Sequence, residues 1–168
     1  MNRLLAESVV FAIGGFLFAV GAASAEEKGV DWKMLEGVKI SLEKGLAVAQ
    51  QKGKPISGKF EIEDGKLQLS TYTASKGKFY EVVVDHVSGK IAKTEQIKEG
   101  DDYAHANAQI KAMAAAKKSL RAAVAKAVAA NPGYRAVSAV PELEGGKPVA
   151  AVILQNASGT KNVSATLD

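Results

Sequence analysis

The chain has 168 residues, with 22 lysines and arginines against 18 aspartates and glutamates, a formal net charge of +4 and no cysteine. The absence of cysteine excludes a disulfide framework and a thiol nucleophile, so the fold has to depend on an apolar core. Most basic residues are lysines interspersed with carboxylates, whereas nucleic-acid proteins more often cluster arginines and aromatics on one face, so the pattern favours an ordinary solvated surface.

The first 25 residues have the pattern of a secretory signal peptide. Arg3 lies near the start, an uncharged apolar run follows, and Ala23-Ser24-Ala25 matches the A-x-A cleavage motif. We expect cleavage between Ala25 and Glu26 and a periplasmic or secreted protein. The alternative is an uncleaved membrane anchor, but the uncharged run from Ser8 to Ala25 contains three glycines. Its strongly apolar part is also shorter than the ~20 residues that span a membrane.

Residues 26–40 are expected to form an N-terminal arm that leads into a helix. Ser41 is a candidate N-cap, and Leu42, Leu46 and Ala49 follow at helical spacing on one face. Gly53 and Pro55 are stop signals. The pattern predicts a helix from Leu42 to Lys52.

Three strands are predicted after this helix. Lys59–Glu63 and Lys66–Ser70 alternate apolar and polar residues on either side of Asp64-Gly65, a dipeptide typical of a tight hairpin. The segment from Phe79 to Asp85 is rich in aromatic and β-branched residues, which favour a strand. We expect Leu42 and Leu46 to cover one face of this sheet and to bury Phe60, Ile62, Leu67, Leu69, Val82 and Val84.

A polar turn from Asp85 to Gly89 ends the third predicted strand. Asp85 can accept hydrogen bonds from backbone amides of the turn, Gly89 can adopt a positive φ, and Lys90 can resume an extended path. Together with Tyr80, these residues give the pattern Y-x-V-x-V-D-x-x-x-G-K, and the segment around it resembles a PepSY domain, a module named after peptidase propeptides. The resemblance implies a helix on a small sheet and a cell-envelope location, with the turn in a structural role.

An alanine-dense segment over residues 102–130 predicts a long helix, which can kink or divide near Lys117 to Ser119. The order of elements then repeats. The shift that places Ser41 on Ser119 also places Leu46 on Val124, and strands are predicted at 135–140, 149–155 and 161–167. We predict a second PepSY-like unit in which Asp168 takes the place of Asp85 and the rest of the turn is missing.

The predicted fold class is α+β, with two tandem units that each pack a helix on a small antiparallel sheet of about three strands. The first unit covers residues 41–97 and the second 119–168, and a long alanine-rich helix links them, with residues 98–118 as the linker. Each unit alone would bury little apolar surface, so we expect the two to dock against each other.

The sequence predicts no enzyme activity, no cofactor and no metal site. His86 and His105 are the only imidazoles, and neither lies in a zinc or calcium motif. Ser41 and Lys44 match S-x-x-K, but the motifs that accompany it in serine enzymes are missing, so Ser41 is better explained as a helix cap. Asp85 is a lone carboxylate and therefore a better turn residue than a catalytic acid.

The predicted function is a non-catalytic exported binding module. The PepSY resemblance implies that it holds or inhibits a peptidase, and an exposed strand edge, at Lys66–Thr73 or Lys161–Leu167, can capture an extended peptide. Leu69 and Tyr72 are the candidate contact residues.

The alternative is a structural or accessory envelope protein without a peptidase partner, attached weakly to anionic surfaces through its lysines. High salt should weaken that attachment and leave strand-edge capture intact. We expect no nucleic-acid partner. The oligomeric state stays open.

Overall fold

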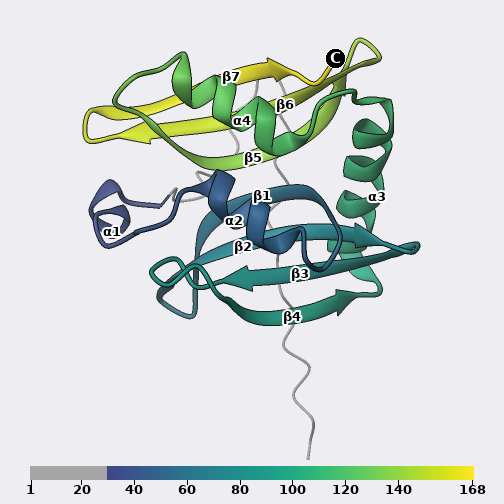
Figure 1. Ribbon diagram of the computed structural model, residues 1–168, viewed down its shortest axis with the longest axis horizontal. Helices are drawn as coiled ribbons and strands as arrows, with labels where there is room; N and C mark the ends of the chain where they lie inside the picture. The colour runs from purple at the N-terminus through teal and green to yellow at the C-terminus, as the bar shows by residue number, and fades with distance from the viewer. Residues whose placement is uncertain (1–29) are drawn as a thin grey trace, which may run out of the picture.

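Seven antiparallel strands form one continuous sheet in the order β4-β3-β2-β1-β5-β6-β7 in the computed structural model (Figure 1). The structure describes residues 30–168, so the predicted leader and its cleavage site at Ala23, Ala25 and Glu26 lie outside the described residues. The strands are β1 (Lys54–Glu63), β2 (Lys66–Ser75), β3 (Lys78–Val84), β4 (Ile91–Ile97), β5 (Arg135–Glu144), β6 (Lys147–Asn156) and β7 (Gly159–Thr166). The helices in this range are α1 (Trp32–Leu35), α2 (Leu42–Ala49), α3 (Gly100–Ala115) and α4 (Leu120–Ala129).

The predicted fold class, two small-sheet units joined by a long helix, is wrong. β1 and β5 pair in antiparallel fashion at Gly58↔Ala139 and Lys59↔Ser138, so the strands of both halves belong to one sheet. This pairing satisfies backbone groups on two strands that would otherwise be free edges. The halves therefore meet edge to edge.

The alanine-rich segment divides, as its sequence allowed, so no single long helix links the halves. Ala116 is extended with φ −77° and ψ 139°, and Ser119 caps α4 by accepting a hydrogen bond from the backbone N–H of Ala122. The backbone amides of Lys117 and Lys118 both donate to the carbonyl of Leu167, at 2.7 and 2.9 Å. The break keeps both lysine side chains at the surface, whereas a continuous helix would place Lys117 in its apolar stripe.

Strand β4 was not predicted, because its sequence lacks the alternation of a half-buried strand. Only its end residues, Ile91 and Ile97, are partly buried, and the five residues between them are exposed. Such a strand pairs through its backbone at the edge of a sheet that others have already built. Sequence patterning therefore gives little sign of it.

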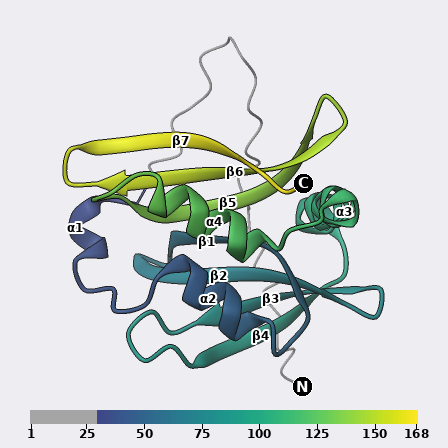
Figure 2. The same ribbon diagram turned by 45° about the horizontal axis from the view of Figure 1, so that its top comes forward.

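The core lies between the sheet and the pair α2 and α4, which lie side by side on one face, here called the helix face (Figure 2). Leu42, Leu46 and Val124 from the helices are fully or almost fully buried there, over strand residues that include Leu69, Val82 and Val84. Two predicted core residues lie at its margin, because Ile62 is 41% exposed and Leu67 is only partly buried.

The two halves of the sheet repeat each other closely. One shift of the sequence, here called the strand alignment, carries Lys54–Glu63 of β1 onto Arg135–Glu144 of β5, and both strands have a bulge at the equivalent place, between Pro55 and Ser57 and between Ala136 and Ser138. The starts of α2 and α4 follow a slightly smaller shift, the predicted one that places Ser41 on Ser119 and is here called the helix alignment. Because Gly58 pairs with its own counterpart, Ala139, an approximate two-fold axis passes through the β1–β5 contact.

Candidate functional site

The turn after β3 has the predicted structural role. The Asp85 carboxylate accepts backbone N–H groups from Ser88 at 2.6 Å and from Val87 at 3.3 Å, and Gly89 adopts a φ of +72°. Hydrogen bonding to Ser88 lowers the pKa of Asp85 below its ordinary value. Lys90 contributes its carbonyl, which accepts from the Asp85 amide at 2.8 Å, and Tyr80 is half-buried in β3. These contacts confirm Asp85 as a turn-capping residue.

The prediction that Asp168 takes the place of Asp85 is wrong. The strand alignment puts Thr166 there, and the Thr166 hydroxyl accepts from the Asp168 amide at 3.2 Å as Asp85 accepts from Val87. The carbonyls of His86 and Leu167 are likewise equivalent, because each accepts hydrogen bonds from two consecutive backbone amides. These amides belong to the two residues just before the helix caps Ser41 and Ser119. The prediction placed Asp168 by the end of the last predicted strand, at 168 − 85 = 83 residues from Asp85, whereas the strand alignment shifts the sequence by 135 − 54 = 81 residues.

Leu69 and Tyr72 do not form a partner surface. Leu69 is 0% exposed and lies under Gly45 of α2, and Tyr72 is 7% exposed on the other face of the sheet. β2 pairs on both sides, with β1 and β3, so the predicted free edge at Lys66–Thr73 is also wrong. The two errors have separate causes, since α2 covers Leu69 and β3 occupies the second edge of β2.

The remaining candidates for chemistry are spread over separate elements. Ser41 accepts a hydrogen bond from the backbone amide of Lys44 at 3.3 Å and so caps α2. His86 lies in the turn after β3, with a buried Nδ1 that has no partner, and His105 is half-buried on α3. Across residues 30–168, no group of three or more His, Cys, Asp or Glu side chains is arranged to hold a metal ion.

A cavity of about 480 Å³ lies between the C-terminal end of α2 and the N-terminal end of α4, and Leu46, Lys54, Met113 and Arg121 line it. The Lys54 ammonium donates to the carbonyl of Met113 at 3.0 Å. Arg135, the counterpart of Lys54 in the second half, donates in the same way to the carbonyl of Leu35 at 2.7 Å. Lys54 therefore belongs to the repeated framework, and its charge is no sign of a ligand.

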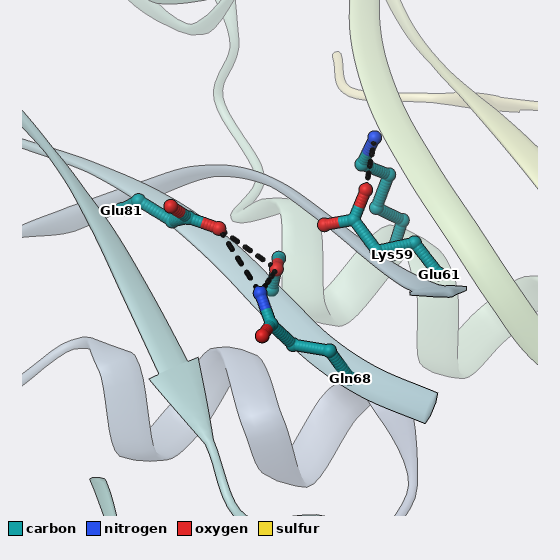
Figure 3. Close-up of polar contacts among 5 residues, drawn as sticks. Lys59, Glu61, Gln68 and Glu81 are labelled. Atoms are coloured by element: carbon teal, nitrogen blue, oxygen red, sulfur yellow. Dashed lines mark hydrogen bonds and ion pairs between the residues drawn. The ribbon is translucent and has the colours of Figure 1, made fainter. Parts of the chain in front are cut away.

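The opposite side of the sheet carries five polar side chains, here called the polar cluster, in two separate groups: Lys59 with Glu61, and Gln68 with Ser70 and Glu81 (Figure 3). The Glu81 carboxylate accepts from the Ser70 hydroxyl at 2.9 Å and from the Gln68 amide at 3.3 Å. Lys59 pairs with Glu61 at 2.7 Å, with each side chain only 19% exposed. Strand alternation explains the location, since Gly58 and Leu69 face α2 and their neighbours must face away.

Helix α3 lies against this same side, here called the α3 face. Gln109 accepts the hydroxyl of Ser57 at 2.8 Å, and the ring of Tyr103 meets Phe79 of β3 edge to face at a centroid distance of 5.4 Å. Asp102, in the first turn of α3, has a buried Oδ1 without a hydrogen-bond partner. Sequence reasoning missed this group because three strands and a helix contribute to it, and no local motif joins them.

Burial disfavours the charged forms of several of these groups. Burial raises the pKa of Glu81 although the hydrogen bond from Ser70 opposes the shift, and burial also raises the pKa of Asp102. For Tyr72, burial and then the carboxyl groups of Glu81, Glu61 and Asp102 raise the pKa, so the phenol stays protonated. Of these carboxyl groups, that of Glu81 belongs to the residue that pairs with Tyr72 in the β2–β3 register.

The raised pKa of Glu81 predicts a pH dependence of stability. Above the ordinary value of 4.5 and up to the raised value, the folded state binds more protons than the unfolded state, so stability falls as the pH rises through this window. Glu81→Gln removes this contribution. We therefore expect the stability of Glu81→Gln relative to the unaltered protein to increase as the pH rises above 4.5, as measured by urea unfolding at several pH values. An unchanged difference across that range would contradict the shift.

Two strands, β4 and β7, have a free edge. In β4, Lys93 and Glu95 form an ion pair at 2.9 Å and are both about half exposed. In β7, the residues from Gly159 to Asn162 are exposed, and Lys161 hydrogen-bonds to the side chain of Asn131 beside the end of α4. The Lys161–Leu167 segment is thus at an edge of the sheet, unlike Lys66–Thr73.

In the described part of the chain, no helix is both long and apolar enough to cross a membrane. No family model matches the chain, and no curated protein matches it. A solved structure from Clostridium difficile 630, described as a "putative lipoprotein", is 8% identical over 80% of this chain and 91% of its own, with a TM-score of 0.43. Similarity at that level carries no argument about function, and the resemblance to PepSY stays a prediction.

Proposed function

We propose that this chain is a non-catalytic exported protein that binds an extended segment of a polypeptide along the free edge of β7. The observation that carries the proposal is the edge itself, a strand of 8 residues, Gly159–Thr166, paired with β6 on one side only. An unpaired row of N–H and C=O groups is a template on which another chain can form backbone hydrogen bonds.

The two free edges differ in how they are protected. Charged side chains on an edge strand discourage pairing with other chains. β4 carries the Lys93–Glu95 ion pair and a register irregularity against β3. β7 has no proline and one charged residue, Lys161, whose ammonium bonds to Asn131 beside α4. The β7 edge is therefore the better protein-binding edge.

The leader-like sequence and the PepSY resemblance support a partner in the cell envelope, and a peptidase is the class that the resemblance implies. Backbone pairing gives such binding little dependence on salt, since it rests on hydrogen bonds between main chains. An accessory role through surface lysines would instead weaken steeply as the ionic strength rises.

Proline substitutions in β7 test the proposal. Neighbouring residues of an antiparallel strand direct their N–H groups alternately toward the paired strand and outward. One of the two variants Lys161→Pro and Asn162→Pro therefore removes only an N–H that points outward, whereas the other breaks a hydrogen bond to β6. The variant that keeps its hydrogen bond to β6 should have the higher melting temperature of the two, which identifies it. In a pull-down from envelope extract, we expect the unaltered protein to retain a partner at high salt and this variant to lose it.

The matched control is the same pair of substitutions on the other edge, Thr94→Pro and Glu95→Pro in β4. Of these two β4 variants, the one that removes only an outward N–H should still retain the partner. Retention by the β7 variant would contradict edge capture, and loss of all partners from the unaltered protein at high salt would favour the accessory role.

A further inference from the structure

The cavity between α2 and α4 lies on the helix face, where the C-terminal end of α2 meets the N-terminal end of α4. Its volume of about 480 Å³ is within the range of roughly 300–1,000 Å³ that small-molecule sites occupy. Leu46, Met113 and Leu120 line it, and each of these residues is at most 2% exposed. The cavity can therefore accommodate the apolar part of a small ligand.

The charged side chains that line the cavity are both positive. They are Lys54 and Arg121, and no carboxylate is among the lining residues. Lys54 already donates to the carbonyl of Met113 as part of the repeated framework, so the electrostatic argument depends on Arg121. Arg121 is exposed and forms no salt bridge within residues 30–168. Its guanidinium group is thus available to an anion at the cavity.

Arg121 lies in the first turn of α4, where a positive side chain is unfavourable for the helix. The N–H groups at a helix start already carry a partial positive charge, which acidic side chains normally balance. α4 has no acidic residue in its first turn, and Lys117 and Lys118 come just before its cap. A bound anion would balance this concentration of positive charge.

The other half of the protein shows that the framework does not require this arginine. The helix alignment places Arg121 on Glu43, in the first turn of α2. Ser41 and Ser119 cap their helices in the same way, so the repeated structure accepts a glutamate at this position. A glutamate also complements the helix dipole, which an arginine opposes. Helix stability therefore gives no reason for Arg121, whereas an anionic ligand does.

We propose that this cavity, here called the Arg121 site, binds a small amphipathic carboxylate. The guanidinium group of Arg121 suits a carboxylate because it can donate two parallel hydrogen bonds to it. The hydrocarbon chain of the ligand then lies against Leu46, Met113 and Leu120. This inference does not depend on peptide capture at β7, because the Arg121 site lies between the two helices and β7 is the last strand of the sheet.

Isothermal titration calorimetry with octanoate tests the proposal. Acetate is the first control ligand, since it has the carboxylate without the hydrocarbon chain, and octylamine is the second, since it has the chain with the opposite charge. We expect octanoate to bind and both controls to bind at least about tenfold more weakly. Absence of octanoate binding at millimolar concentration, or equal affinity for octylamine, would overturn the proposal.

Two variants of α4 locate the binding. Arg121→Glu, which copies Glu43, should weaken octanoate binding about tenfold or more. Its melting temperature should not fall, because the glutamate complements the helix dipole, so the loss cannot come from unfolding. The matched control is Lys126→Glu, which makes the same change of charge in the last turn of α4 and should alter the affinity less than about twofold. Unchanged affinity in Arg121→Glu, or an equal loss in Lys126→Glu, would contradict the proposal.

Discussion

Replacing Leu46 by alanine is expected to lower the free energy of unfolding by roughly 2–5 kcal/mol. Leu46 is 0% exposed, and its Cδ2 lies 3.1 Å from the point where a Cβ on Gly58 would be. Its side chain therefore covers the β1–β5 contact and also lines the cavity between α2 and α4. Because Leu46 already borders this cavity, its truncation would enlarge the cavity, and few neighbouring atoms could move in to replace the lost contacts.

Urea unfolding monitored by circular dichroism measures the effect of Leu46→Ala. Met34→Ala is the control, since Met34 is 40% exposed and its loss should change stability by less than about 0.5 kcal/mol. A loss below about 1 kcal/mol in Leu46→Ala would show that α2 does not hold the two halves together through this residue.

A leucine at position 58 is expected to destabilise the protein by about 3 kcal/mol or more. A Cβ at Gly58 would lie 3.2 Å from Leu42 and 3.4 Å from Thr71, besides its contact with Leu46. The side chain would extend into the layer between α2 and the sheet, where the residues are already fully buried. Either α2 would move away from the sheet or the β1–β5 pairing would open.

Thermal unfolding of Gly58→Leu, followed by circular dichroism, measures this loss. Gly37→Leu is the matched control, because nothing lies within 4 Å of a Cβ at Gly37, and we expect its melting temperature to change little. If Gly58→Leu melted at the same temperature as the unaltered protein, the close packing of α2 on β1 would be wrong.

Local sequence patterns were sufficient for most of the elements. Ser41 caps α2 as predicted, Ser119 has the same role in α4, and Asp64-Gly65 and Gly145-Gly146 form the β1–β2 and β5–β6 turns. Capping and tight turns depend on residues that are neighbours in the chain, so a single sequence contains the necessary information. The turn at Asp85 was predictable for the same reason.

The arrangement of these elements could not be predicted in the same way. The joint between the halves depends on Gly58 meeting Ala139, and neither residue has a pattern that indicates pairing between strands so far apart in the sequence. The prediction also left an edge of β2 free, whereas β1 and β3 flank this strand, so Leu69 and Tyr72 were wrongly assigned to a partner surface. The polar cluster was missed because Gln68, Ser70 and Glu81 come together only once β2 and β3 are paired.

The repetition within the chain is also more useful in the structure than in the sequence. The helix alignment matches the starts of α2 and α4, whereas the strand alignment matches the starts of β1, β2 and β3 to those of β5, β6 and β7, so no single shift of the sequence matches both. Once the register is known, each strand residue on one half has a counterpart on the other. Glu81 and Tyr72 have Asn162 and Ile153 as counterparts, so the shared framework does not by itself determine these two side chains.

Differential scanning calorimetry of the unaltered protein tests most directly whether the two halves form one folded body joined at β1 and β5. The continuous sheet predicts a single transition whose calorimetric enthalpy equals its van't Hoff enthalpy, because neither half keeps its inner edge and its shared helix layer without the other. Two separate transitions, or a calorimetric enthalpy well above the van't Hoff value, would contradict the continuous sheet and restore two independent units.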